Sequence, residues 1–203
     1  MLKIWLRRLF WLACFAWLLY QGAIFAQVWH LRSYAAESTA LMEQRKAAMR
    51  LAGKPAKLQW QWKPLAQISP HLRRAVIVAE DAAFYDHDGF DWAGIRLAAE
   101  KNLAQGRVVA GGSTITQQLA KNLFLSGSRT PWRKAQEAII TVMLEQALGK
   151  RRILEIYLNI VEWGNGVFGA EAAARHYFGR PARSLSRQQA AKLAAMLPNP
   201  RYY

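Results

Sequence analysis

The pattern of hydrophobic positions divides the chain into an almost continuously apolar N-terminal stretch and a longer part in which apolar and polar residues are mixed. The apolar stretch covers residues 9–29, and Gln21 and Gln27 are its only strongly polar members. A helix rises about 1.5 Å per residue, so this stretch would be roughly 30 Å long, the thickness of a bilayer's hydrocarbon core. The pattern therefore predicts one transmembrane helix.

Residues on either side of the apolar stretch indicate how it would lie in a membrane. Tryptophans occur toward its ends, where aromatic belts form. A cleaved signal peptide is the alternative, because a basic region precedes the stretch and residues 23–26 include small side chains. The stretch is longer than the hydrophobic region of a usual signal peptide, which favours an uncleaved anchor with the later residues across the membrane from the cytoplasm. The basic residues that would keep residues 1–8 in the cytoplasm are Lys3, Arg7 and Arg8.

A connector follows the anchor. Residues 33–52 are rich in helix formers, and Ser33 is a suitable N-cap for a helix there. Residues 58–62 alternate apolar and polar side chains, which predicts a short extended segment. We therefore expect a helical connector at residues 30–57, between the anchor and a domain that begins near residue 58.

Residues 58–203 are predicted to form one mostly α domain. Ser69 followed by Pro70 is typical of a helix start, and the helix that begins there carries Glu80 and is expected to end at Asp88-Gly89. No stretch alternates long enough to build a sheet. Further helices are predicted at residues 92–105, 115–125, 132–148, 153–162, 170–178 and 187–197.

Composition adds a constraint on the partner. The chain has 28 Lys and Arg residues against 13 Asp and Glu residues, a net charge of +15. Such an excess indicates an anionic partner: nucleic acid, an anionic membrane surface or a phosphorylated substrate. The single cysteine, Cys14, lies in the apolar stretch and excludes an intrachain disulfide.

The first candidate for chemistry is Glu80, which follows the apolar run 76–79 and precedes Asp81. In a continuous helix, Glu80 would share a face with Val76 and Phe84, since residues four apart are neighbours. A carboxylate among apolar side chains suits acid–base chemistry. A helix end whose acids face water explains this stretch equally well.

A second candidate is the segment 111–122, with the sequence GGSTITQQLAKN. Its two glycines precede a predicted helix N-terminus, where free N–H groups favour an anion. Thr114, Gln117 and Lys121 share one face of that helix, and such side chains suit a sugar or a phosphate. A solvated polar face is the alternative, although the paired glycines and glutamines favour a binding site.

A third candidate lies around Arg133 and Glu137, which are four residues apart on a predicted helix. They could form an ordinary salt bridge worth a few tenths of a kcal/mol. Together with Arg129 and Lys134 they could instead form a cationic cluster with one carboxylate, able to bind a diphosphate, directly or through a divalent metal. The sequence leaves both interpretations open.

Taken in order, these segments resemble the motifs of the peptidoglycan glycosyltransferases of penicillin-binding proteins, glycosyltransferase family 51. Segments 153–159 and 190–198 resemble the fourth and fifth motifs of that family. The resemblance runs from about residue 59 onward. With one anchor and no room for a transpeptidase domain, the chain is most similar to the monofunctional biosynthetic peptidoglycan transglycosylases. That resemblance also predicts more helix beyond Tyr203, where the sequence stops.

The resemblance implies a lysozyme-like α fold and an enzyme that polymerises lipid II into β-1,4-linked glycan strands, with inversion and release of undecaprenyl diphosphate. Glu80 would be the general base and Glu137 a second catalytic carboxylate, near the diphosphate or a metal bound to it (Mg or Mn). Lys121, Arg129 and Arg133 would bind the diphosphate. The other residues that would line the cleft are Asp81, Ser113, Thr114, Gln117, Gln118, Asn122 and Lys134.

The same resemblance implies the cellular setting. The chain would be a single-pass protein of the bacterial inner membrane, with its catalytic domain on the periplasmic side. Its partners would be lipid II, the growing glycan strand, membrane lipid and proteins of cell wall synthesis or division. No organic cofactor and no nucleic acid are expected.

Elementary chemistry agrees with these roles. Attack from the face opposite a diphosphate inverts the anomeric carbon and needs a base near the incoming hydroxyl. A diphosphate can leave unprotonated if cations stabilise its charge. A membrane-anchored lytic enzyme, the first alternative, would need a proton donor for a sugar leaving group instead. The second alternative, a basic non-enzymatic membrane protein, would not depend on Glu80.

Overall fold

The computed structural model describes residues 2–107, 109, 111–125, 127–128 and 130–202, and it confirms a mostly α chain. The α-helices are α1 (Leu2–His30), α2 (Ala40–Leu51), α3 (Pro70–Glu80), α4 (Trp92–Gln105), α5 (Ile115–Phe124), α6 (Pro131–Ala147), α7 (Lys150–Ile160), α8 (Ala170–Phe178) and α9 (Arg187–Met196). Two single-turn helices lie at Leu65–Gln67 and Ala182–Ser184, and three short strands are β1 (Gln59–Trp60), β2 (Glu162–Gly164) and β3 (Val167–Phe168).

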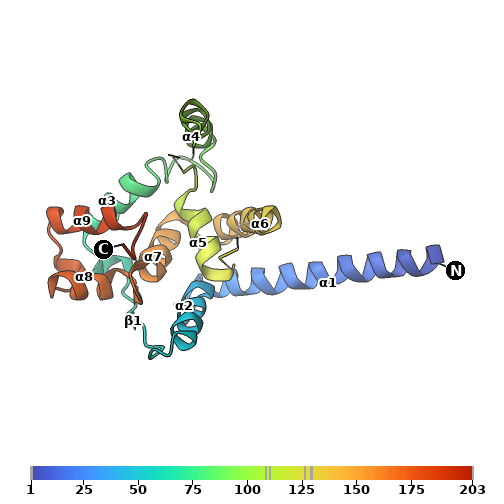
Figure 1. The fold of residues 1–203 in the computed structure, drawn as a ribbon, viewed down its shortest axis with the longest axis horizontal. Helices are drawn as coiled ribbons and strands as arrows, with labels where there is room; N and C mark the ends of the chain where they lie inside the picture. Colours follow the sequence, from blue (N-terminus) through green and yellow to red (C-terminus); the bar gives the residue numbers. More distant parts are fainter. Residues whose placement is uncertain (1, 108, 110, 126, 129, 203) are drawn as a thin grey trace.

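Helix α1 extends away from the other helices, with the N-terminus at its far end (Figure 1). It has 29 residues and is long and apolar enough to cross a membrane by length and composition. Its C-terminal part packs on the rest of the chain, against α6. Gln21 of α1 and Gln136 of α6 exchange two amide hydrogen bonds, at 2.8 and 3.0 Å, and both side chains are buried.

Most of the helix starts expected from the sequence are confirmed. Ser69 caps α3 by accepting a hydrogen bond from the N–H of His71, and Pro70 is the first helical residue. Thr114 and Gln117 form a reciprocal capping box at the start of α5. Pro131 likewise opens α6.

Three helix boundaries differ from the sequence prediction by three residues or more. Helix α2 begins at Ala40, where the Thr39 side chain caps it, and not at Ser33. Helix α7 begins at Lys150 and not at residue 153. Helix α3 ends at Glu80, because the next residue, Asp81, leaves the helical conformation (φ −163°, ψ 73°).

The early end of α3 changes the surroundings of Glu80. Phe84 does not continue the helical face of Glu80 but lies in the turns after the helix, fully buried in the core. The prediction that Glu80 and Phe84 share one helix face, and that Asp88-Gly89 ends the helix, is therefore wrong. The catalytic candidate is the last residue of its helix and faces an open region.

A small sheet is also present, contrary to the expectation from the sequence. Its strand order is β1-β3-β2, with β1 parallel and β2 antiparallel to β3. The strands have two or three residues each. Strand β1 lies within residues 58–62, where alternation predicted a short extended segment, so that prediction is confirmed. Strands β2 and β3 are too short to show the alternation that identifies strands in a sequence.

The core surrounds α7, whose residues 156–160 are all buried. Helices α5 and α6 pack on each other and on α7, α3 packs on α9, and α2 packs on α5. In Figure 1, α8 and α9 lie on the side opposite the free end of α1, and α2 lies beside α5 near the base of α1. This packing brings the end of α3, the length of α5 and the start of α6 into one region.

Candidate active site

Glu80 lies at the centre of this region. Its side chain is half-buried, and its Oε2 atom accepts a hydrogen bond of 2.6 Å from Nε2 of Gln118, on α5. The Gln118 Oε1 atom in turn accepts a hydrogen bond of 3.1 Å from the Tyr157 hydroxyl of α7. Among the described residues, no hydrogen bond occupies Oε1 of Glu80, so that oxygen is available to a substrate hydroxyl.

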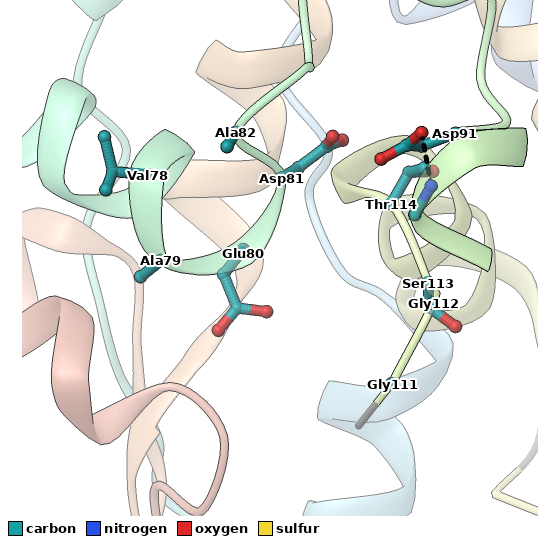
Figure 2. Close-up of a pocket in the computed structure, with 11 residues that line it drawn as sticks. Val78, Ala79, Glu80, Asp81, Ala82, Asp91, Gly111, Gly112, Ser113 and Thr114 are labelled. Atoms are coloured by element: carbon teal, nitrogen blue, oxygen red, sulfur yellow. Dashed lines mark hydrogen bonds between the residues drawn. The ribbon is translucent and has the colours of Figure 1, made fainter. Parts of the chain in front are cut away.

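A polar pocket of about 160 Å³ opens beside Glu80. The end of α3 forms one wall, and residues 111–114 form the opposite wall. Figure 2 shows the carboxylates of Glu80 and Asp81 pointing in different directions, with Asp81 directed toward Thr114. Ser113 lies in the exposed part of the wall, where the sequence placed a substrate contact.

The Asp81 side chain makes different contacts from those of its neighbour, Glu80. Its carboxylate is buried, and Oδ2 accepts a hydrogen bond of 2.9 Å from the N–H of Ile115, in the first turn of α5. Its Oδ1 lies 2.9 Å from Nε2 of His87. Because the Gly89 N–H donates to Nδ1 of His87, the ring proton is on Nε2 and is donated to Asp81. Both oxygens thus bind protein groups, and we infer that Asp81 positions the wall of the pocket.

This role predicts a stability effect for Asp81→Ala. The substitution leaves the Ile115 N–H and the His87 N–H without their buried acceptor, and each unsatisfied group costs about 1–3 kcal/mol. We expect a clearly lower midpoint in denaturant unfolding of the detergent-solubilised chain. Asp86→Ala, which changes an exposed aspartate of the same segment, is the control and should leave the midpoint unchanged. Equal midpoints for both variants would contradict the role.

Thr114 and Gln117 also serve the local structure. Both are buried, and each caps the start of α5 through the other's backbone. The Thr114 hydroxyl donates a hydrogen bond of 2.7 Å to the carbonyl of Gly89. The sequence analysis predicted that Thr114, Gln117 and Lys121 share a ligand-binding helix face. Of these three side chains, Lys121 is the one that lines the cleft described below.

The second polar group surrounds Glu137, which is 3% exposed. Its Oε2 accepts a hydrogen bond of 2.6 Å from Nη1 of Arg133, and its Oε1 pairs with the Lys134 ammonium. Lys121, on the neighbouring helix, adds a third cation that interacts with Glu137. The salt bridge between Arg133 and Glu137 is thus present, and it belongs to a cluster with more cations than carboxylates.

The charges of the cluster affect the pKa of Lys121. Desolvation in the cleft lowers the pKa of its ammonium below the usual 10.5. Glu137 opposes this effect, while Arg133 and Lys134 lower the pKa further. Lost water and the neighbouring cations both disfavour the charged form of Lys121. An anion bound beside the ammonium would stabilise that charged form, so the position favours an anionic ligand.

A cleft of about 540 Å³ opens beside the cationic cluster, and its lining residues include Gln118, Lys121, Asn122 and Arg133. Gln118 therefore faces the cleft on one side and Glu80 on the other. Arg129, predicted to bind the diphosphate, lies outside the described residues.

Part of the cleft comes from residues that the sequence analysis did not identify. Leu41, Gln44 and Arg45 of α2 line it, so the predicted connector helix also forms a wall. Arg45 binds both oxygens of the buried Glu162, and Gln44 donates a hydrogen bond of 3.1 Å to the carbonyl of Leu125. Gln44 and Leu125 are separated by 81 positions in the sequence, and Arg45 and Glu162 by 117 positions. No local sequence pattern predicts contacts between residues so far apart.

The residues around Glu137 do not form a metal site on their own. Both of its oxygens already bind cationic side chains. Within the described ranges, no group of three His, Cys, Asp or Glu side chains is placed to hold a metal ion. We therefore derive no chemical step through a protein-bound metal.

Comparison with known proteins bears on this arrangement. The family model described as Transglycosylase matches residues 46–203. The chain is 57% identical to the biosynthetic peptidoglycan transglycosylase of Nitrosospira multiformis, over 99% of this chain and 87% of that protein. It is 59% identical to the protein of the same name from Laribacter hongkongensis, over 92% and 82% of the two chains. The corresponding protein of Azoarcus sp. is 60% identical, over 95% and 84%.

Proposed function

Because the chain belongs to the transglycosylase family, we propose that it polymerises lipid II into β-1,4-linked glycan strands, with inversion and release of undecaprenyl diphosphate. The enzyme is a glycosyltransferase of peptidoglycan synthesis, and its substrate is the membrane-bound precursor together with the growing strand. One observation carries the proposal. Gln118 connects the two parts of the site, because it binds the Glu80 carboxylate beside the polar pocket and also lines the cleft that contains Lys121 and Arg133.

The proposed reaction assigns one role to each side of the cleft. Glu80 takes the proton of the acceptor's 4-hydroxyl as that oxygen bonds to the anomeric carbon of the donor. The bond from that carbon to the diphosphate breaks, and undecaprenyl diphosphate leaves with the electron pair. Lys121 and Arg133 stabilise the negative charge that develops on the leaving group.

Glu137 acts in this proposal by holding the cations in place. Its two ion pairs orient Arg133 and Lys134 toward the region of the diphosphate. A divalent cation such as Mg or Mn belongs, in this proposal, with the substrate's diphosphate and not with a protein site. No organic cofactor is needed, because proton transfer and charge stabilisation complete the reaction.

The lytic alternative is less well supported by the site. A lytic enzyme protonates a sugar leaving group and has no use for several cations beside its carboxylate. The cluster of Lys121, Arg133 and Lys134 suits a diphosphate leaving group.

We also propose that α1 anchors the enzyme in the bacterial inner membrane with the catalytic domain on the periplasmic side. The basic residues near its start would stay in the cytoplasm, as the positive-inside rule requires. A substrate with a long lipid chain cannot leave the bilayer at low cost, so an active site beside the anchor meets it at the surface. Membrane lipid and proteins of cell wall synthesis or division are the further proposed partners, and nucleic acid is not among them.

The direct test uses the full chain in detergent with lipid II. We expect long glycan strands on a gel, together with stoichiometric undecaprenyl diphosphate. Preformed glycan added to the same enzyme should remain intact. Small muropeptides released from preformed glycan, without polymer from lipid II, would overturn the proposal.

The lowered pKa of Lys121 predicts the alkaline limb of the pH profile. The ammonium of the free enzyme loses its proton at a lower pH than an ordinary lysine, whose pKa is 10.5. The pH dependence of kcat/KM reports the pKa values of groups in the free enzyme. We therefore expect kcat/KM for lipid II to decrease with rising pH, with a midpoint below pH 10.5. Lys121→Arg should move the limb to higher pH, since a guanidinium stays protonated. An unmoved limb in Lys121→Arg would contradict the assignment.

A further inference from the structure

A chain of hydrogen bonds leads from the core of the protein to the catalytic glutamate. It begins at the hydroxyl of Tyr157, whose side chain is 0% exposed. This hydroxyl lies 3.1 Å from Oε1 of Gln118, and Nε2 of Gln118 lies 2.6 Å from Oε2 of Glu80. Three helices, α7, α5 and α3, each supply one member.

The two ends of the Gln118 amide are not equivalent in this chain. An ionised carboxylate can only accept hydrogen bonds, so the amide must direct its NH₂ group to Glu80. Its carbonyl oxygen then faces Tyr157 and needs a donor. The reversed amide would place its oxygen against the carboxylate. The carboxylate therefore sets the orientation of the amide, and the Tyr157 hydroxyl stabilises it by donating to the amide oxygen.

Tyr157 is suited to remain a donor. Burial raises the pKa of its hydroxyl well above the ordinary value, and the negative charges of Glu80 and Asp81 raise it further. The phenol therefore keeps its proton at pH values at which an ordinary tyrosine would lose it. Tyr157 and its neighbours in α7 are buried, so packing holds the hydroxyl oxygen of Tyr157 in place.

The contact determines which oxygen of Glu80 can act. Gln118 occupies Oε2, whereas no hydrogen bond between described residues reaches Oε1. With Oε2 bound, rotation of the carboxylate is restricted, and Oε1 remains the oxygen available to a ligand beside the pocket at the end of α3. Positioning of this kind changes the catalytic rate and leaves substrate binding largely intact.

We propose that Tyr157 is a positioning residue for glycan polymerisation, acting only through Gln118 to orient the Glu80 carboxylate toward the acceptor hydroxyl. This inference rests on the proposed function, because it needs Glu80 to be the base. The competing explanation is that Gln118 merely satisfies the buried hydroxyl of Tyr157, as buried polar groups require. The two explanations predict different effects of Tyr157→Phe on kcat in a variant that already lacks the Gln118 amide.

The test is a double-mutant cycle on the full chain, measured as kcat and KM for lipid II. Tyr157→Phe removes one oxygen and should lower kcat about threefold to tenfold, with KM unchanged. In a Gln118→Leu background, the same Tyr157→Phe change should have no further effect on kcat. Tyr177→Phe is the matched control, because its hydroxyl donates a hydrogen bond of 3.0 Å to the carbonyl of Trp163, away from Glu80. It should keep the wild-type kcat.

Several outcomes would overturn the inference. Tyr157→Phe could retain full kcat, or it could lower kcat by the same factor in both backgrounds, which would indicate a general structural effect. Gln118→Asn extends the test to a variant that leaves the core untouched, since its amide is one methylene too short to reach both partners. It should lose rate, and a full rate would also count against the inference. Absence of polymer from the wild-type chain would overturn the proposed function, and the inference with it.

Discussion

We expect Glu80→Gln to abolish the polymerisation of lipid II while the chain remains folded. The substituted side chain has nearly the same shape but cannot accept the proton of the acceptor hydroxyl. General base catalysis contributes on the order of 10²-fold to 10⁴-fold to a rate, so we expect kcat to fall by at least about 10²-fold. The change should be visible as loss of glycan strands on a gel and of released undecaprenyl diphosphate.

Stability should change little in this variant. Glu80 is half-buried at the end of α3, and among the described residues its one hydrogen-bond partner is Gln118, which can bind an amide oxygen as well. Glu100→Gln, which alters an exposed glutamate of α4, is the matched control and should retain full activity. If Glu80→Gln still polymerised lipid II at a rate near wild type, Glu80 would not be the base.

Lys121→Met is expected to have the second largest effect. Among the described residues, the Lys121 ammonium has no ion pair within 4.0 Å, so the cation is available to a ligand in the cleft. Removal of one preorganised group that stabilises transition-state charge typically costs about 10²-fold to 10³-fold in kcat. We expect a loss of that size in the rate of undecaprenyl diphosphate release.

The effect should depend on position as well as charge. Lys101→Met removes an exposed lysine of α4 and changes the net charge equally, so it is the matched control and should keep the wild-type rate. Lys121→Arg keeps the charge and should recover part of the activity lost in Lys121→Met. Equal rates for Lys121→Met and Lys101→Met would show that the cation at this position does not contribute to catalysis.

Glu80 and Asp81 show which part of the site could be predicted from the sequence and which part could not. The two carboxylates are adjacent, and both were predicted to lie at the site. The end of α3 separates them, because Asp81 turns away and binds Ile115 and His87. The Asp81–Ile115 contact links residues 34 positions apart, so its existence depends on how α3 and α5 pack.

Residues close in sequence were the easier part of the prediction. The caps at Ser69 and Thr114 and the pairing of Arg133 with Glu137 each involve residues within four positions of one another. Local backbone geometry is sufficient to bring such residues into contact. The small sheet and the end of α3 at Glu80 were predicted wrongly, because both depend on contacts with distant parts of the chain.

Four features could be predicted from the order of the residues alone: the apolar N-terminal helix, the mostly α character, the order of the motifs and the candidates Glu80, Lys121 and Arg133. Only the tertiary structure decided that Gln118 contacts Glu80, 38 positions away, and that Tyr157 contacts Gln118, 39 positions away. It also brought α2 into the wall of the cleft through Arg45 and Glu162, 117 positions apart. The physical reason is that periodicity and caps depend on neighbouring residues, whereas contacts between helices depend on the packing of whole faces.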